Sequence, residues 1–276
     1  MKTAYFSLAV GDNINIHHQA QFALLSVMAH NPNRSLLIVT DYPEHYKWLA
    51  PAVTPFYISN DQLKSWRGEQ DYFFRIKLKA LQKLLNQVPS HLVYFDSDTV
   101  CLSHLSLLEQ GLANHQCFMH DKEFPLHTGP TKTTRQMWRV GKGQTFGPFL
   151  IDQSSVMWNS GVVALPQGSS KYVEMAIEAC DALCRSKMRP YFVEQFALGL
   201  ALSQSQKLNE AKQWFLHYWD NKVTWQTTVI EPFLLEAQKL PLEKAADLIH
   251  QVDPFSIKKP VKLGFFKKIQ NKLGIG

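Results

Sequence analysis

The sequence is poor in charged residues and has no long hydrophobic run. Charged residues make up 19% of its 276 residues, below the roughly 25% of typical soluble chains. Hydrophobic residues make up 45%, which is enough to build a core and excludes a wholly disordered chain. The longest apolar stretches, residues 92–95 and 196–202, are far shorter than the ~18 residues of a membrane span, which excludes an integral membrane protein.

Cysteine is also scarce. The four cysteines form no CxxC pair, and Cys180 and Cys184 lie four residues apart in a predicted helix, so we expect no disulfide framework. This usage fits a reducing compartment, and we expect a cytoplasmic protein. The short apolar run at residues 4–10 ends without a small-residue cleavage pattern. We therefore interpret it as a first strand and not as a signal peptide.

The net charge of +6 comes from the C-terminal end of the chain. Six lysines follow the last acidic residue, Asp253, and the other 23 basic residues balance 23 acidic residues. A duplex-binding protein needs its positive charge on a groove or helix of the folded domain, so we expect no nucleic-acid partner. The tail should instead meet a local anionic partner through Lys258, Lys259, Lys262, Lys267, Lys268 and Lys272.

The basic tail, residues 254–276, also carries apolar residues at intervals of three or four, namely Leu263, Phe266, Ile269 and Leu273. A helix with this pattern has an apolar stripe flanked by cations, which is typical of a segment lying in an anionic membrane interface. Such contact would hold the protein peripherally on the inner face of the cell membrane. The alternative is an ordinary terminal helix or a solvated tail, because Gly264 and Gly274 weaken a helix.

Strand-like and helix-like segments alternate in the first hundred residues. Apolar strand patterns occupy residues 4–10, 36–40, 53–59 and 91–95, and helical patterns occupy residues 19–30, 46–49 and 74–88. This alternation predicts an α/β domain with a mostly parallel central sheet flanked by helices. Ligands of such sheets bind at the carboxyl ends of the strands.

The pattern changes in the second part of the chain. Residues 110–153 are rich in Gly, Pro, His and Thr, and we predict a long irregular insertion that faces a substrate. A strand pair around residues 156–165 and helices near 171–187 and 193–203 follow. The body is thus expected to form one domain.

A buried strand ending in two carboxylates is the strongest local motif. In Tyr94-Phe95-Asp96-Ser97-Asp98, the two aspartates lie two residues apart directly after an apolar strand, so their side chains can converge. Two carboxylates suit Mn²⁺ or Mg²⁺ carrying a substrate diphosphate. A simple Asp-Ser-Asp surface turn would have the same sequence, but the strand before it favours a metal site.

The same residues also fit the opening motif of haloacid-dehalogenase-type phosphatases, with Asp96 as nucleophile. That motif normally follows the first strand, whereas about ninety residues precede it here, and no second acidic pair is evident. A phosphatase therefore remains an alternative, as does a non-catalytic sugar-nucleotide-binding protein.

Four separated segments resemble the GT-A-fold nucleotide-sugar glycosyltransferases, especially the bacterial family 8-like group. They are AYFSLAVGDN (residues 4–13), YFDSDTV (94–100), WNSGVV (158–163) and HYWDNK (217–222). The first is similar to the first strand and nucleotide-binding turn of the family, and the second to its DxD metal motif. The third resembles its Asn-Ser/Thr-Gly-Val strand, and the fourth its late His-containing motif.

The resemblance implies a GT-A (Rossmann-like) single domain over residues 1–253, with a nucleotide-binding half (1–109) and an acceptor-side half (110–253). It implies a metal-dependent transferase that moves a sugar from a nucleotide sugar, expected to be a UDP-sugar, to a saccharide or glycolipid acceptor, with retention at the anomeric carbon. The metal ligands would be Asp96, Asp98 and His217. The donor would be bound by Ala9, Val10, Asp12, Asn13, Ser97, Asn159, Ser160 and Gly161 in addition to the DxD motif.

Further site residues follow from the same resemblance. Lys222 would meet the diphosphate, and Glu194 and Gln195 stand where relatives have an Asp-Gln pair that serves the sugar or the acceptor. Arg75 and Lys79 lie on the polar side of the helix before the DxD strand, where they either face solvent or reach the diphosphate or a metal-binding aspartate. A lone histidine beside Tyr and Trp is often a packed core residue, and this remains the alternative for His217.

Overall fold

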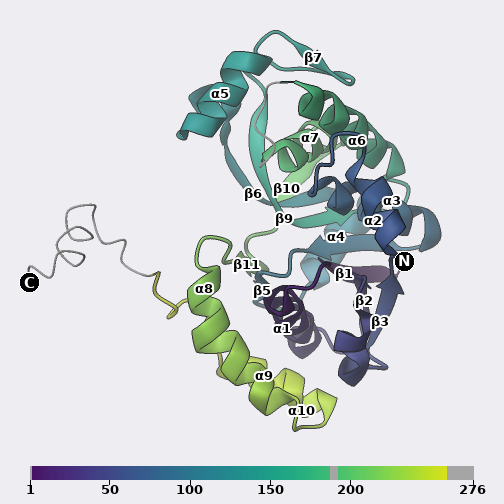
Figure 1. The fold of residues 1–276 in the computed structure, drawn as a ribbon, viewed down its shortest axis with the longest axis vertical. Helices are drawn as coiled ribbons and strands as arrows, with labels where there is room; N and C mark the ends of the chain where they lie inside the picture. The colour runs from purple at the N-terminus through teal and green to yellow at the C-terminus, as the bar shows by residue number, and fades with distance from the viewer. Residues whose placement is uncertain (1, 187–191, 260–276) are drawn as a thin grey trace, which may run out of the picture.

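The computed structural model describes residues 2–186 and 192–259 (Figure 1). The first half of the chain alternates strands and helices, as expected. Its elements are β1 (Thr3–Ala9), α1 (Ile14–His30), β2 (Ser35–Thr40), η1 (Pro43–Leu49), β3 (Val53–Tyr57), α2 (Asn60–Arg67), α3 (Arg75–Gln87), β4 (His91–Phe95), β5 (Thr99–Cys101) and α4 (Ser106–Ala113).

The second half begins with a long strand and ends with short helices. Its elements are β6 (Cys117–Pro125), η2 (Leu126–Thr128), α5 (Lys132–Gly141), β7 (Thr145–Phe146), β8 (Phe149–Leu150), β9 (Val156–Leu165), α6 (Ser170–Arg185), α7 (Val193–Leu202), β10 (Leu208–Glu210), β11 (Phe215–His217), α8 (Lys222–Trp225), η4 (Gln226–Ile230), α9 (Glu231–Ala237), α10 (Leu242–Asp247) and η5 (Leu248–Gln251).

A seven-stranded sheet in the order β10-β6-β9-β4-β1-β2-β3 joins both halves of the chain. Four strand pairs are parallel, and β9 runs antiparallel to its neighbours β4 and β6. The expected single α/β domain with a mostly parallel sheet is therefore confirmed. A separate two-stranded antiparallel sheet pairs β5 with β11.

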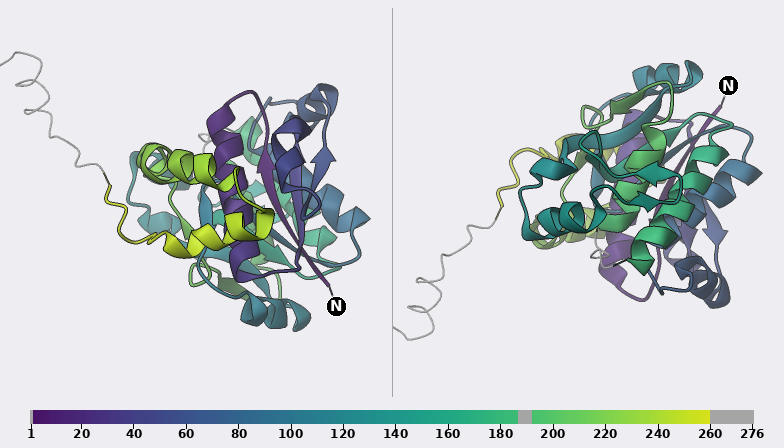
Figure 2. Two further views of the ribbon diagram at one scale, coloured as in Figure 1. Left: turned by 90° about the horizontal axis from the view of Figure 1, so that it is seen from below. Right: turned by 90° about the horizontal axis from the view of Figure 1, so that it is seen from above.

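Helices cover both faces of the sheet (Figure 2). Helices α3, α6 and α7 enclose one part of the core, and α1, α4, α9 and α10 enclose the other. Strand β1 shows why the sequence folds this way: Phe6 packs in the first part and Tyr5 in the second, because successive side chains of a strand point to opposite faces. Both side chains are fully buried.

Helix boundaries follow from capping residues. The side chain of Asn13 accepts a hydrogen bond from the backbone N–H of Asn15, which caps the start of α1. Helix α3 ends at Gln87 because the following Val88 stands before Pro89 and takes an extended conformation. Helix α1 thus starts earlier than expected and directs its first turn toward the carboxyl end of β1.

Two expectations about the second half were wrong. Residues 110–153 are not an irregular insertion, because they contain β6, which lies in the sheet between β9 and β10, and helix α5. The bulges in β6 and its polar segment from residue 120 to 123 hid the strand pattern. Residues 156–165 form one ten-residue strand and not a pair.

The start of the basic tail contacts the body beside α8. The side-chain amide of Asn221 donates a hydrogen bond to the backbone oxygen of Ile257, and Lys259 forms an ion pair with Asp220. The rest of the tail, from residue 260, lies outside the described residues. Among the residues that are described, none of the helices has both the length and the hydropathy to cross a membrane.

Candidate active site

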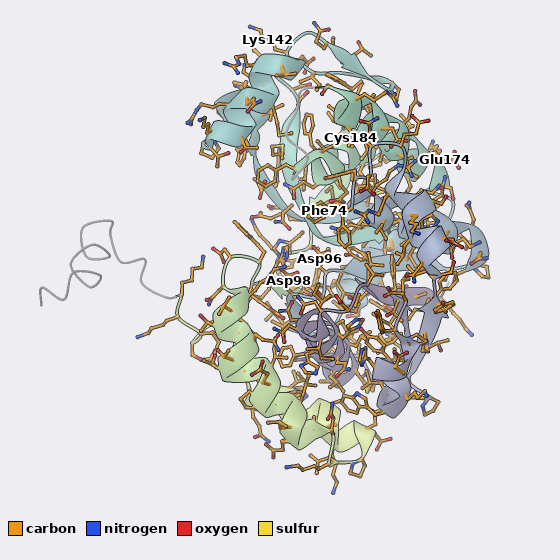
Figure 3. All side chains as sticks on the ribbon, in the orientation of Figure 1. Phe74, Asp96, Asp98, Lys142, Glu174 and Cys184 are labelled. Carbon is orange, nitrogen blue, oxygen red and sulfur yellow. The ribbon has the colours of Figure 1, made fainter. Side chains whose placement is uncertain are left out.

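A cleft of about 990 Å³ opens at the carboxyl ends of β1 and β4. Figure 3 shows Asp96 and Asp98 near the middle of the molecule, between the part that contains α5 and the part that contains α8, α9 and α10, with Phe74 above them. Residues from both halves line the cleft, including Val10 and Asn13 after β1 and Asn159 on β9. This is where ligands bind in open α/β sheets.

The turn after β4 directs both aspartates into the cleft. The backbone N–H of Asp96 donates to the backbone oxygen of Gly161 on β9 at 2.7 Å, which holds the end of β4 in the sheet. The hydroxyl of Thr99 donates to the backbone oxygen of Asp96 at 2.8 Å and closes the turn. Asp98 is 3% exposed and Asp96 is half-buried.

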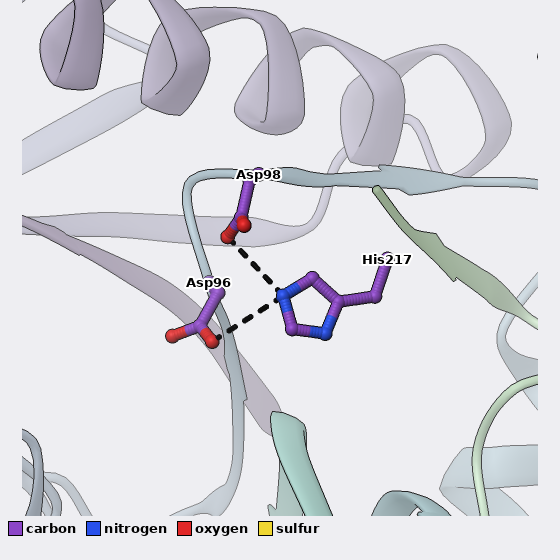
Figure 4. A group of neighbouring side chains, drawn as sticks. All are labelled: Asp96, Asp98 and His217. Carbon is purple, nitrogen blue, oxygen red and sulfur yellow. Dashed lines mark ion pairs between the residues drawn. The ribbon is translucent and has the colours of Figure 1, made fainter. Parts of the chain in front are cut away.

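Strand β11 brings His217 to the same place. Its pairing with β5 sets His217 opposite Thr99, and the backbone N–H of Tyr218 donates to the backbone oxygen of Asp98 at 3.1 Å. The Nε2 atom of His217 lies 3.3 Å from Asp98 Oδ1 and 3.7 Å from Asp96 Oδ2 (Figure 4). The structure thus brings together the three expected metal ligands.

The chemistry of these three side chains fits a divalent cation. One ligand atom from each lies within 4.8 Å of the others, and within residues 2–186 and 192–259 no other His, Cys, Asp or Glu cluster meets this condition. Two carboxylate oxygens and an imidazole nitrogen directed at one point repel one another unless a cation or a proton lies between them. Oxygen ligands with one imidazole suit Mn²⁺ or Mg²⁺.

Lys222 at the start of α8 lies next to this cluster. Its Nζ atom is 2.8 Å from Asp98 Oδ2, and its side chain is 48% exposed in the cleft. Burial alone would raise the pKa of Asp98, but His217 and Lys222 outweigh burial and hold this pKa below its ordinary value. Asp98 is therefore ionised at neutral pH, as a metal ligand must be.

Sequence reasoning missed Lys77, a buried cation behind Asp96. Its Nζ atom lies 3.2 Å from Asp96 Oδ1 and 3.0 Å from the hydroxyl of Ser160. Burial alone would lower the pKa of Lys77, but the carboxylates of Asp96 and Glu194 raise it. Lys77 therefore stays charged and fixes the Asp96 side chain, which also accepts a hydrogen bond from the Tyr94 hydroxyl.

Lys77 belongs to helix α3, and the two α3 residues that the sequence pointed to, Arg75 and Lys79, lie away from the cleft. Arg75 forms a two-bond ion pair with Asp181 on α6, and Lys79 contacts Gln82 on its own helix. Neither side chain lines the cleft. Residues two apart on a helix point about 200° apart, so the face that meets Asp96 carries Lys77 and not its basic neighbours.

Glu194 and Gln195 at the start of α7 have different surroundings. Gln195 lines the cleft, whereas Glu194 is 4% exposed and lies behind Ser160, whose hydroxyl donates to Glu194 Oε2 at 3.2 Å. Lys77 Nζ is 3.6 Å from the same oxygen. Burial raises the pKa of Glu194 to about 7 against the lowering effect of Lys77.

The remaining expected donor-binding residues divide between cleft and core. Val10, Asn13, Ser97 and Asn159 line the cleft. Ala9 is buried in the core, Asp12 is exposed outside the lining, and Ser160 contacts Lys77 as described above. Gly161 lies so close to the His217 ring that an added Cβ atom would stand 2.2 Å from Nδ1.

The cleft also has an aromatic rim. Phe73, Phe74 and Trp219 are 46%, 40% and 57% exposed and line the cleft, where aromatic faces suit sugar rings. The helical pattern was expected to begin at Phe74, but α3 begins at Arg75 and Phe74 stands at its N-cap. Glu123 on β6 adds a carboxylate to the same wall, and burial in the cleft raises its pKa.

Comparisons in sequence find nothing, and comparisons in structure find glycosyltransferases. No protein-family model and no curated protein matches the chain. The glycosyltransferase GlyE of Streptococcus pneumoniae superposes with a TM-score of 0.52 and 13% identity over 95% of this chain. This chain has a glycosyltransferase fold.

The match covers 66% of GlyE, so the chain spans just under two thirds of that protein. The bifunctional glycosyltransferase WbbM superposes with a TM-score of 0.48 and 12% identity over 76% of this chain and 38% of its own. The superposition on GlyE supports the fold alone, and the particular likeness to the family 8-like group stays a prediction from the sequence motifs.

Proposed function

We propose that this protein is a metal-dependent glycosyltransferase that moves a sugar from a nucleotide sugar, and specifically a UDP-sugar, to a saccharide acceptor. The convergence of Asp96, Asp98 and His217 in a large cleft of a glycosyltransferase fold carries this proposal. A non-catalytic binding protein could hold the same metal, so transfer of the sugar to an acceptor is what separates it from the enzyme.

Asp96, Asp98 and His217 would hold Mn²⁺ or Mg²⁺. The ion, when bound, supplies positive charge that neutralises the departing diphosphate. Lys222 adds a second positive charge at the exposed side of Asp98. Lys77 orients Asp96, so that its carboxylate is ready to bind without reorganisation.

The transferred sugar and the acceptor would occupy the part of the cleft beside its aromatic rim. Gln195 and Asn159 offer amides there, and Phe74 and Trp219 offer aromatic faces. Glu194 does not line the cleft, so we assign it a positioning role through Lys77. We propose retention of anomeric configuration, following the resemblance to the family 8-like group.

We further propose that the protein acts in the cytoplasm on an acceptor that includes lipid-linked saccharides. The start of the basic tail runs beside α8, and α8 borders the cleft through Lys222 and Val223. If the tail binds an anionic membrane, the cleft would therefore lie near the membrane surface. This part of the proposal rests on the tail composition.

Screening nucleotide sugars by thermal shift, with and without Mn²⁺, tests the proposal. A donor that binds only the folded state raises the melting temperature, so selective stabilisation identifies donor and metal together. Hydrolysis of a generic phosphoester, abolished by Asp96→Ala, would instead support the phosphatase. Stabilisation without transfer to any saccharide would support the binding protein.

A further inference from the structure

The two ring nitrogens of His217 have different partners. Nε2 faces Asp96 and Asp98 at 3.7 and 3.3 Å, whereas Nδ1 lies 2.9 Å from Oδ1 of Asn159. A neutral imidazole carries its hydrogen on one nitrogen and a lone pair on the other. Which nitrogen carries the hydrogen therefore decides whether His217 can bind a cation through Nε2.

The backbone determines how the Asn159 side chain is oriented. The N–H of Gly161 points at Asn159 Oδ1 over 2.9 Å, and an N–H can only donate. The atom at this end of the amide must therefore be the oxygen. The amide nitrogen at the other end then meets the carboxylate of Glu123, with which Asn159 forms a hydrogen bond. The contacts with Gly161 and with Glu123 therefore indicate the same orientation of the Asn159 amide.

This orientation fixes the hydrogen on Nδ1 of His217. Because Asn159 Oδ1 can only accept, Nδ1 must donate, and Nε2 is the nitrogen left to bind a cation that lies between it and the two aspartates. The ring is also held by contact with Gly161, where an added Cβ would lie 2.2 Å from Nδ1. Asn159 and Gly161, both on strand β9, thus hold the imidazole ring in place.

We propose that Asn159 is a positioning residue that keeps His217 in its metal-binding tautomer and orientation. The inference rests on the proposed metal-dependent function, and it assigns Asn159 a role behind the metal ligands in addition to any contact with the donor. Hydrogen-bond partners of metal-binding histidines typically change metal affinity by about 10- to 100-fold when they are removed. This proposal therefore concerns the affinity for the metal itself.

The test is a Mn²⁺ titration of the full chain with saturating UDP, followed by the electron paramagnetic resonance signal of free Mn²⁺. Asn159→Leu removes the acceptor, and we expect an affinity about 10- to 100-fold weaker than in the unmodified protein. Asn159→Asp keeps an oxygen for both Gly161 and His217, and we expect it to restore the affinity. Electron spin echo modulation from an imidazole nitrogen should persist in Asn159→Asp and be lost in Asn159→Leu.

Two further variants complete the test. Glu123→Gln leaves the Asn159 oxygen in place, and we expect unchanged Mn²⁺ affinity. Asn159→Ala also removes the acceptor, and its weaker affinity decides the matter if Asn159→Leu does not fold. Unchanged affinity in Asn159→Leu, or equal losses in Asn159→Leu and Asn159→Asp, would overturn the proposal. If the unmodified protein takes up no Mn²⁺ with UDP, the proposed function itself fails.

Discussion

Replacing Asp98 with Asn should abolish metal-dependent UDP binding without unfolding the protein. Asp98 is 3% exposed, with one oxygen 3.3 Å from His217 Nε2 and the other 2.8 Å from Lys222 Nζ. The change keeps the side-chain volume but removes one of two carboxylate ligands. Changes behind a metal ligand cost about 10- to 100-fold in affinity. Loss of a ligand should therefore cost more than 100-fold, or more than about 2.7 kcal/mol.

Calorimetric titration with UDP, in the presence and absence of Mn²⁺, measures this loss. Asp220→Asn is a matched control, because Asp220 lies between His217 and Lys222 in the sequence but pairs with Lys259 and does not line the cleft. We expect the control to bind as the unmodified protein does, and Asp96→Asn to behave as Asp98→Asn does. Unchanged Mn²⁺-dependent affinity in both Asp96→Asn and Asp98→Asn would refute the glycosyltransferase proposal.

Three other predictions concern separate parts of the chain. His217→Ala should weaken Mn²⁺ binding in the presence of UDP, whereas a lower melting temperature with normal Mn²⁺ affinity would show a packing role only. Because the pKa of Glu194 is raised from 4.5 to about 7, folding stability should fall as pH rises through this window, by on the order of 3 kcal/mol. Glu194→Gln should remove that fall in denaturant unfolding, and an identical pH profile would contradict the assignment. Replacing Lys267, Lys268 and Lys272 with Glu should abolish co-sedimentation with anionic vesicles, since each basic residue contributes about 1 kcal/mol; unchanged sedimentation would show that the tail is not a membrane anchor.

The sequence predicted the parallel part of the fold well and the antiparallel part poorly. Strands β1, β2 and β4 are buried on both faces and bounded by helices with regular periodicity, so local patterns were sufficient to locate them. Strand β6 has register shifts and exposed residues in its second half, so it lacks a regular period of two. Its place beside β9 depends on contacts between distant segments, which no local pattern encodes.

The same limit applies to the site. Asp96 and Asp98 were identified because both lie at the end of one strand, and His217 only through the order of family motifs. Lys77 was missed because a lysine on an amphipathic helix usually faces solvent. Its burial depends on α3 packing beside β4, where two carboxylates from distant segments, Asp96 and Glu194, offset the cost of burying a charge.

The charges around the cluster imply that metal and diphosphate bind cooperatively. Asp96 and Asp98 already face two cations, Lys77 and Lys222, so these two carboxylates are balanced before any ligand binds. A divalent cation alone would leave two uncompensated positive charges, and a nucleoside diphosphate would supply the negative charge that balances them. Mn²⁺ affinity should therefore rise in the presence of UDP, and UDP affinity should rise with Mn²⁺ by the same factor. Titrations in both directions measure this factor, and equal Mn²⁺ affinity with and without UDP would show that the two lysines do not set the charge of the site.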